Sequence, residues 1–465
     1  MTSKSKRHAD HLTLGRNLKI GLFHLGSGMA DVLITGVWNR IMISDLGFRA
    51  TPVSLLASLR YFLAPLSVWA GRQSDKHALF GYHRLFWIWS GRALMAVSMV
   101  LLGFLTASLV GGAAAGLAMW LGLTAAMLLF SLGNALSGSV FLALVYDRAP
   151  EHQRGRAVGV VWTFLLTGFA VGGAFFALML PSAEGATTDV LPFTAAELRN
   201  LFLVAALAMS TMWFFSLFGE ERRVDPDAPK TSEASGESVS LQRDLRTALD
   251  SPPLRQFMGY LALSMAFAFS QDTILEPFAG DVFDMPADVT TRFAAYWGTT
   301  AIIGSVAFLA LSRRFHALDN RRMSQAGVLA LICTFALYAI AAVLKATALV
   351  TPGLLLLGLG LGMWNIGTLG LMMEMSPDGQ AGTFLGFWTL VVTLSRGLGV
   401  SGGGILRDLA LVLSGNLVTS YVAVFALGAV GLAVSYLFLL RTDPTAFRED
   451  YTPSDPVQVM SAALD

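Results

Sequence analysis

Twelve long apolar stretches dominate this sequence and limit what it can fold into. Each has about 20 residues or more, which is the length that a helix needs to cross a membrane. Apolar residues make up 54% of the chain and charged residues only 14%, whereas about a quarter of a soluble domain is charged. The sequence therefore predicts an integral membrane protein. The expected spans are 18–39, 52–71, 85–109, 114–145, 156–181, 199–219, 254–276, 292–313, 322–345, 349–375, 381–411 and 417–440.

The distribution of lysine and arginine predicts how these spans are oriented. Both residue types are concentrated in the N-terminal tail, the even-numbered loops and the C-terminal tail, and both are sparse in the odd-numbered loops. Because positively charged loops stay in the cytoplasm, both termini are expected to be cytoplasmic. The basic tail leads into a full-length span without a small-residue cleavage site, so we expect no cleaved signal peptide.

One long polar connection, residues 220–252, divides the spans into six and six. It is rich in Glu, Asp, Ser and Pro, unlike the short breaks elsewhere in the chain. The expected organisation is a cytoplasmic basic tail (1–17), an N-terminal six-helix bundle (18–219), a cytoplasmic linker (220–252), a C-terminal six-helix bundle (253–440) and a cytoplasmic tail (441–465).

The two halves repeat a motif that lies where one span ends and the next begins. An acidic residue, a proline and two glycines recur in both copies, and a shift of 227 residues superposes them. The acid can pair at the helix end, the proline stops the helix and the glycines allow close helix contact. The matched residues are Asp147, Pro150, Gly155 and Gly159 in the first copy and Glu374, Pro377, Gly382 and Gly386 in the second, with Gly133 matched to Gly360.

Two parallel six-helix repeats are typical of major-facilitator transporters, whose halves rock about a site near the membrane midplane. The connection between spans 2 and 3 also resembles the loop motif of that superfamily in Gly71, Asp75, Gly81 and Arg84. The expected fold is therefore an all-α membrane protein of the major-facilitator type. It would have 12 transmembrane helices in two six-helix repeats, with both termini cytoplasmic.

Charged residues inside the spans are candidate functional groups, because ionisable side chains in a bilayer pair with one another or line a cavity. Counting from the helix ends places Asp31, Arg60 and Arg396 near the midplane, so an Asp31–Arg60 pair is geometrically feasible. Asp272 and Glu276 fall on one face of the seventh span. Two interpretations stay open: structural pairs that hold helices in register, or groups on the wall of a central cavity, with Asp31 or Asp272 exchanging protons.

An enzyme is not expected. Asp281, Asp284 and Asp288 are spaced like the magnesium–diphosphate acids of membrane prenyltransferases, but Pro286 interrupts the helix that such ligands need, so we expect a solvated acidic loop. Neither an HExxH metal motif nor a phosphate-binding GxxxxGK[ST] loop is present, so no metal or nucleotide cofactor is expected. With a net charge of +1, the chain also has no global electrostatic basis for binding nucleic acid.

Several motifs are specific enough to suggest a family. Residues 271–283 read QDTILEPFAGDVF, which resembles the QD-x-LLEP-x-GG-x-VF signature of the PucC/LhaA family of phototrophic bacteria. Residues 39–43, NRIMI, followed by Leu46-Gly47, resemble that family's NR-(V/I)-MI-x-EL-G segment. Residues 74–75 and 87–91 resemble its SD and (Y/F)IW-x-G elements. Three departures leave the subgroup open: Asp45 replaces the usual Glu, Ala279 replaces a Gly, and residues 81–86 lack one Arg and the Pro of G-x-RR-x-P.

The resemblance implies a major-facilitator-type protein that delivers bacteriochlorophyll during assembly of light-harvesting complexes. The implied location is the bacterial inner membrane, either cytoplasmic or intracytoplasmic and photosynthetic. The implied partners are bacteriochlorophyll as cargo, antenna polypeptides, membrane lipids and the prenyltransferase of pigment synthesis. Two other functions stay open: an accessory partner of that enzyme, or a proton-coupled transporter of another amphipathic solute. The cavity candidates are His24, Asp31, Asn39, Arg40, Arg60, Gln271, Asp272, Glu276 and Arg396.

Two polar residues within the spans have separate expectations. His24 is the histidine that lies inside a span; a neutral imidazole there can bind the magnesium of a chlorin, or simply hydrogen-bond a neighbour. Arg92 is close enough to the cytoplasmic end of its span for the side chain to reach the interface.

Overall fold

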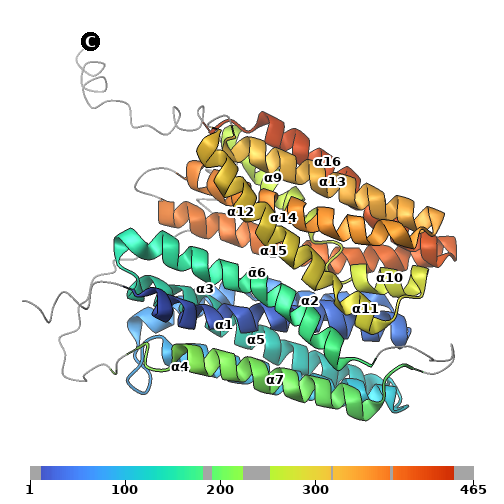
Figure 1. Ribbon diagram of the computed structural model, residues 1–465. Helices are drawn as coiled ribbons and strands as arrows, with labels where there is room; N and C mark the ends of the chain where they lie inside the picture. The colour runs from blue at the N-terminus through green and yellow to red at the C-terminus, as the bar shows by residue number, and fades with distance from the viewer. Residues whose placement is uncertain are drawn as a thin grey trace, which may run out of the picture.

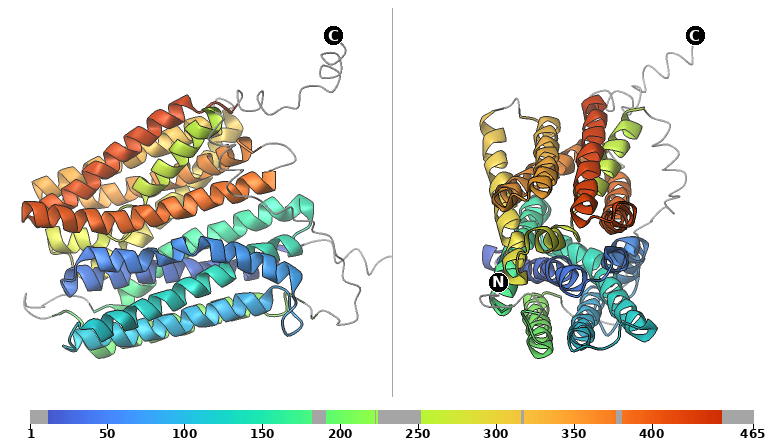
Figure 2. Two further views of the ribbon diagram at one scale, coloured as in Figure 1. Left: turned by 180° about the vertical axis from the view of Figure 1, so that it is seen from behind. Right: turned by 90° about the vertical axis from the view of Figure 1, so that its right-hand side faces the viewer.

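The computed structural model describes residues 12–181, 191–221, 223, 252–315, 318–376 and 381–444, and these residues form a body of long helices. Figure 1 shows two layers: the helices of the N-terminal half lie below those of the C-terminal half, and the view along the helices in Figure 2 separates the same two groups. Most of the predicted linker 220–252 and of both predicted tails lies outside the described residues. The predicted domain boundaries therefore stay predictions.

The N-terminal half contains two helices that are irregular within the membrane. The first runs from α1 into two π-helical turns, Leu33–Trp38 and Ile41–Asp45, and the second changes direction just before Pro65, between α2 and α3. A proline fits the first turn of a helix but cannot continue one. The helices of this half are α1 (Leu14–Val32), α2 (Ala50–Phe62), α3 (Ala64–Lys76), α4 (Leu85–Val110), α5 (Leu117–Arg148), α6 (Arg154–Met179) and α7 (Ala195–Leu217).

The C-terminal half differs from the sequence expectation at the seventh span. A continuous helix over 254–276 is wrong: α9 ends at Ala268 and α10 begins at Leu275, so Asp272 lies in a non-helical break. Pro277 explains the break, because it has no N–H to donate and its ring would collide with the carbonyl of Thr273 in a continuous helix. The helices of this half are α9 (Pro252–Ala268), α10 (Leu275–Phe283), α11 (Ala287–Thr291), α12 (Phe293–Arg314), α13 (Asn320–Leu344), α14 (Val350–Glu374), α15 (Ala381–Ser414) and α16 (Leu417–Arg441).

Within the described part of the chain, eleven helices, counting the irregular first and second spans as one each, are long and apolar enough to cross a membrane. The interrupted pair α9 and α10 is not among them. The starts of α1 and α4 and the end of α7 lie at the same end of the protein. Arg16 pairs there with Glu220 at 2.6 Å, and the backbone amide of Arg84 donates to the Glu221 carboxylate. We call this the inner end and the opposite one the outer end.

Glycines set the closest helix contacts. A Cβ on Gly133 of α5 would lie 2.3 Å from the carbonyl oxygen of Gly91 on α4, so the two backbones touch. The expectation that the repeat glycines allow close helix contact is wrong for Gly155, Gly159 and Gly386, where an added Cβ would meet no described atom within 4 Å. These repeat glycines face open space at the inner end of α6 and α15, and they therefore do not bring helices together.

We expect Gly133→Ala to destabilise the protein, because the new methyl group would collide with a backbone oxygen that cannot rotate away. Overpacking of this kind costs about 1–3 kcal/mol. Gly138→Ala, five residues further along α5 and with free space around its Cβ position, is the matched control and should leave stability unchanged or slightly improved. Thermal unfolding of both purified variants tests this, and equal melting temperatures would contradict it.

Candidate functional site

Four charged side chains meet where the two halves face each other. Asp31 of α1 pairs with Arg60 of α2, as the sequence suggested. In the C-terminal half, Arg396 of α15 donates from Nη2 to Asp272 Oδ2 at 3.0 Å. The same Arg396 nitrogen lies 3.8 Å from Asp31 Oδ2, and this longer contact links the halves. The network carries two positive and two negative groups, so its net charge is zero.

The break in the seventh span brings Asp272 to Arg396. A Cβ on Gly399 or Gly403 of α15 would lie 2.0 Å or 1.9 Å from the carbonyl oxygens of Ala266 and Ser270, so only glycine lets α9 pack this closely. Just beyond that contact the chain leaves the helix. Gln271 Nε2 then donates to Asp272 Oδ1 at 3.0 Å. The candidates Gln271, Asp272 and Arg396 are therefore assembled by one local contact.

Aromatic rings cover the cations, while part of the network stays open. The Arg396 guanidinium lies 3.9 Å from the Phe269 ring centroid and 5.0 Å from that of Tyr61, on which Arg60 also stacks at 4.8 Å. Such contacts stabilise cations that have lost water. The side chains of Asp31 and Arg396 keep 20% and 25% of their exposure, so these two members of the network are only partly enclosed.

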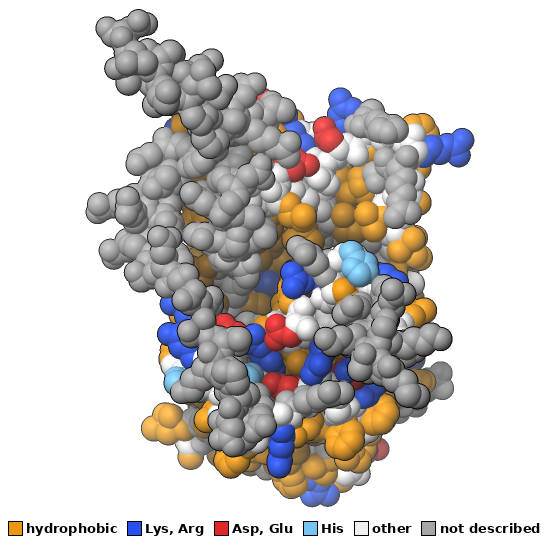
Figure 3. All heavy atoms as spheres, turned by 90° about the vertical axis from the view of Figure 1, so that its left-hand side faces the viewer, with side chains coloured by type: hydrophobic (Ala, Val, Ile, Leu, Met, Phe, Trp, Pro, Cys, Tyr) orange, Lys and Arg blue, Asp and Glu red, His pale blue; other side chains and the backbone are white. Residues whose placement is uncertain are grey.

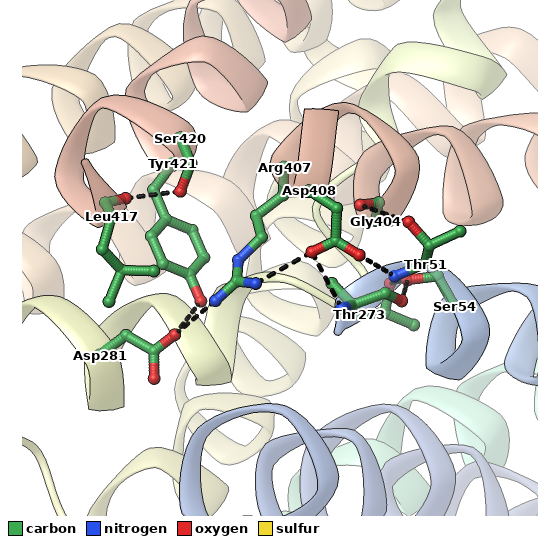
Figure 4. A network of polar contacts seen from close by, with 11 residues as sticks. Thr51, Ser54, Thr273, Asp281, Gly404, Arg407, Asp408, Leu417, Ser420 and Tyr421 are labelled. Carbon is green, nitrogen blue, oxygen red and sulfur yellow. Dashed lines mark hydrogen bonds and ion pairs between the residues drawn. The ribbon is translucent and has the colours of Figure 1, made fainter. Parts of the chain in front are cut away.

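The outer end is closed by polar contacts between the halves, which we call the outer seam (Figure 4). Asp408 of α15 accepts hydrogen bonds from the backbone amides of Ala50 at 3.1 Å and Thr51 at 2.7 Å. It thus caps α2 of the other half, whose own N-cap residue, Arg49, makes no side-chain cap. Thr273 Oγ1 also donates to Ser54 Oγ on α2 at 3.1 Å.

Arg407 connects the outer seam to the short helix α10. It donates to Asp408 at 2.9 Å and to Asp281 at 3.1 Å, and Tyr421 of α16 donates to the same Asp281 carboxylate at 2.5 Å. The expectation of a solvated acidic loop is therefore wrong for Asp281, whose side chain is 10% exposed and paired. It is also wrong for Asp288, which is buried and pairs with Arg292.

The remaining candidates of the seventh span and its surroundings belong to this outer region. Arg40 pairs with Asp45 at 2.9 Å and donates to the Met285 carbonyl at 2.9 Å. Asn39 and Glu276 are buried. Because Asp272 lies outside a helix and Glu276 lies inside α10, the expected common helical face of these two residues is wrong. The structure therefore separates candidates that the sequence placed together: Asp272 lies at the midplane, whereas Asn39, Arg40 and Glu276 lie in the outer region.

At the inner end, the loop-motif residues form a second cluster. Arg84 pairs with Asp75 at 2.5 Å and with Asp147 at 3.0 Å. Glu221, which the sequence did not single out, accepts hydrogen bonds from the backbone amides of His83, Arg84 and Leu85 at 2.7–3.1 Å. A cavity of about 370 Å³ lies here, away from the midplane network, and is lined by Ser74, Asp75, His83, Arg84, Leu144, Asp147, Arg148 and Glu221.

Figure 3 views the inner end and shows acidic and basic side chains gathered on it. Other motif residues are also placed there. The Cβ position of Gly71 lies 3.6 Å from Ser139 Oγ. Glu374 accepts from Asn320 at 2.7 Å, and Pro150 follows the end of α5. Pro377 lies outside the described residues, and Gly382 is placed only as part of α15.

His24 lies on α1 within an aromatic cluster of the N-terminal half. Its ring centroid is 4.8 Å from that of Phe141 and 6.1 Å from that of Trp162, which it meets edge-on. The residue is 9% exposed, and its Nδ1 has no hydrogen-bond partner among the described residues. Nδ1 is therefore not held in place by a hydrogen bond to a described residue, although the ring packs among aromatic side chains.

We expect Asp408→Ala to open the outer seam, because α2 would lose its cap and Arg407 would lose one of its two acidic partners. Loss of a cap costs about 1 kcal/mol. In a Cys333→Ser background, a Ser54→Cys probe in the buried seam should react faster with a membrane-impermeant maleimide when Asp408 is replaced. A Ser108→Cys probe, which is exposed at the outer end of α4, should react equally in both backgrounds. Unchanged labelling of the Ser54→Cys probe would contradict the assignment.

The solved structures that resemble this chain show the fold. They include a bacterial homologue of the lysosomal transporter Spinster in an inward-facing, unoccupied state (TM-score 0.68, 15% identity, 95% of this chain and 98% of that one). A bacterial homologue of the iron transporter ferroportin, also inward-facing, gives a TM-score of 0.63 at 15% identity, with 92% and 100% covered. The expected major-facilitator-type fold is thus confirmed. The 12-helix count and the cytoplasmic termini stay predictions.

Sequence comparisons identify the family. Protein PucC of Rhodovulum sulfidophilum is 31% identical over 407 residues, 86% of either chain, and Protein PucC of Cereibacter sphaeroides is 30% identical over 459 residues, 93% of either chain. A protein of Rhodobacter capsulatus named "Bacteriochlorophyll synthase 44.5 kDa chain" is 28% identical over 406 residues, 86% of this chain and 89% of that one. The family model described as PUCC protein matches residues 37–446. The chain therefore belongs to the PucC family.

Proposed function

We propose that this protein receives bacteriochlorophyll between its two halves and hands it to the polypeptides of a light-harvesting complex. The observation that carries the proposal is the partial exposure of Asp31 and Arg396 within the membrane-spanning body. Ionisable groups in such a position mark substrate paths in membrane proteins. The resemblance to the PucC/LhaA family supplies the class of cargo.

The outer seam limits how cargo reaches this space. With α2 capped by Asp408 of the other half, the halves are joined at the outer end. The glycines of α6 and α15 that face open space lie toward the inner end. A phytylated chlorin is too apolar to cross water, so we infer entry and exit from the lipid or from a partner protein on the inner side.

His24 is the proposed contact to the pigment magnesium. Its Nδ1 is without a partner among the described residues, and aromatic rings flank its imidazole. A neutral imidazole donates a nitrogen lone pair to a metal, and aromatic faces pack against a flat macrocycle. Asp31, Arg60, Asp272 and Arg396 would contact the polar edge of the cargo. Asn39, Arg40 and Glu276, which lie in the outer region, would hold the outer end of the site.

The proposed location is the inner or intracytoplasmic photosynthetic membrane, with both termini in the cytoplasm. The inner end carries Arg16, Lys19 and Arg84, and cytoplasmic loops are the positively charged ones. The described spans and the transporter-like fold support a multi-pass protein.

A second candidate function is that of an accessory partner of the enzyme that synthesises bacteriochlorophyll. The printed name of the Rhodobacter capsulatus relative favours it. If it applies, the prenyltransferase should co-purify with this protein, and deletion of the gene should leave antenna levels unchanged. A third candidate function is proton-coupled transport of another amphipathic solute, which the transporters among the solved neighbours favour. If it applies, an uncoupler should abolish the transport.

We expect Arg396→Gln alone to lower both protein level and antenna level in the native host, because Asp272 would be left buried without its cation. Breaking such a pair costs about 3–5 kcal/mol. The double variant Asp272→Asn/Arg396→Gln removes both charges and should restore the protein level. If the charges also contact cargo, antenna absorption in the near infrared should stay low in the double variant.

The double variant decides between the two interpretations of the network. Normal antenna absorption at normal protein level would show that the pair only holds helices in register. The exposed Arg441→Gln variant at the end of α16 is the matched control for removal of an arginine, and it should leave both readouts unchanged.

We expect His24→Leu to reduce the pigment that co-purifies with the protein and to shift its absorption band, because the magnesium would lose its axial ligand. His77→Leu, at an exposed position beyond α3, is the control and should retain the pigment and its band. Absorption and resonance Raman spectra of the two purified variants measure the effect. An unchanged spectrum for His24→Leu would exclude His24 as the ligand.

A further inference from the structure

Arg92 of α4 is buried inside the N-terminal half and has no acidic partner. It is 1% exposed, so the expectation that its side chain reaches the interface is wrong. Among the residues that the structure describes, no Asp or Glu oxygen lies within 4.0 Å of its guanidinium. A permanently charged side chain is therefore enclosed in the part of the protein that crosses the membrane.

Two aromatic rings from neighbouring helices lie against this guanidinium. Its central carbon lies 4.2 Å from the ring centroid of Phe23 on α1 and 4.8 Å from that of Trp213 on α7. These contacts recover part of the lost hydration energy, but an aromatic ring is only a weak acceptor for the N–H groups of the guanidinium. An acceptor for those groups has to approach from the edge.

The edge of Arg92 lacks such acceptors. Within the described ranges, Nη1 donates to the weakly accepting Sδ of Met95 at 3.2 Å, and Nε has no partner there. The indole Nε1 atoms of Trp213 and Trp89 are also buried without partners in the described part of the protein. Trp89 is one helical turn before Arg92 on α4, and the Trp213 ring lies against the Arg92 guanidinium. Arginine and tryptophan side chains only donate, so these three N–H donors are buried without an acceptor among the described residues.

An anion would satisfy both the charge and the donors. Water alone could accept the hydrogen bonds, but it would leave a full positive charge in a medium where unpaired charges are strongly disfavoured. A lipid or a peptide carboxylate would need a path to a side chain that is almost completely enclosed. We propose that α1, α4 and α7 enclose a small inorganic anion of the halide class beside Arg92, bound by the guanidinium edge and the indole N–H groups.

The first test is the melting temperature of the purified full-length protein in chloride and in gluconate at equal ionic strength. Chloride should raise it saturably, by about 2–4 °C, because the anion binds only the folded state. Arg92→Met, which keeps much of the side-chain volume without the charge, should abolish the difference. Arg199→Met, which removes an exposed arginine on α7 near Phe104, should retain it.

A direct measurement covers the case in which Arg92→Met does not fold. Equilibrium dialysis of the wild-type protein with labelled chloride should show one saturable site per chain, from which bromide competes and gluconate does not. Absence of saturable binding, equal melting temperatures in the two salts, or a chloride effect that persists in Arg92→Met would each overturn the proposal. None of these readouts depends on pigment, so the proposal can fail while the proposed function stands.

Discussion

A charge inside a membrane has to be neutralised, and this requirement shapes the interface between the two halves. Each half supplies one acid and one base: Asp31 with Arg60, and Asp272 with Arg396. Each pair stays neutral by itself if the halves move apart. The contact that crosses the interface within the network, from Arg396 to Asp31, is the longest at 3.8 Å. The halves can therefore separate at this level without leaving an unpaired charge in either one.

The outer end is built in the opposite way. There Asp408 caps a helix of the other half through two backbone amides, and separation would leave both the carboxylate and the amides without partners. Arg407 links this cap to Asp281 on α10, whose preceding break carries Asp272. The segment from the break to α10 is thus tied to α15 at both ends, by Arg396 and by Arg407. The two halves are firmly joined at the outer end and only weakly linked at the midplane. This arrangement favours separation of the halves toward the inner end.

Hydropathy predicted the membrane class, and the repeated arrangement of six and six spans predicted the fold, because both depend on patterns over many residues. The Asp31–Arg60 pair also followed from chain position, since both depths count from helix ends. The break in the seventh span was not predicted, because the apolar stretch 254–276 is long enough for an uninterrupted helix and Pro277 falls just beyond it. The roles of Asp408 and Glu221 could not be predicted, because each caps a helix distant in sequence. The burial of Arg92 depends on the packing of α1 and α7, which no local pattern specifies.

We propose that the space beside Arg396 holds a pigment while the outer seam stays closed. The most direct test is a cryo-electron microscopy map of the protein purified in mild detergent from pigmented membranes. We expect planar density of a macrocycle between α1 and α15, next to the midplane network, with Asp408 still bound to the start of α2. Side chains filling that space completely, with no macrocycle in a sample that carries pigment, would contradict it.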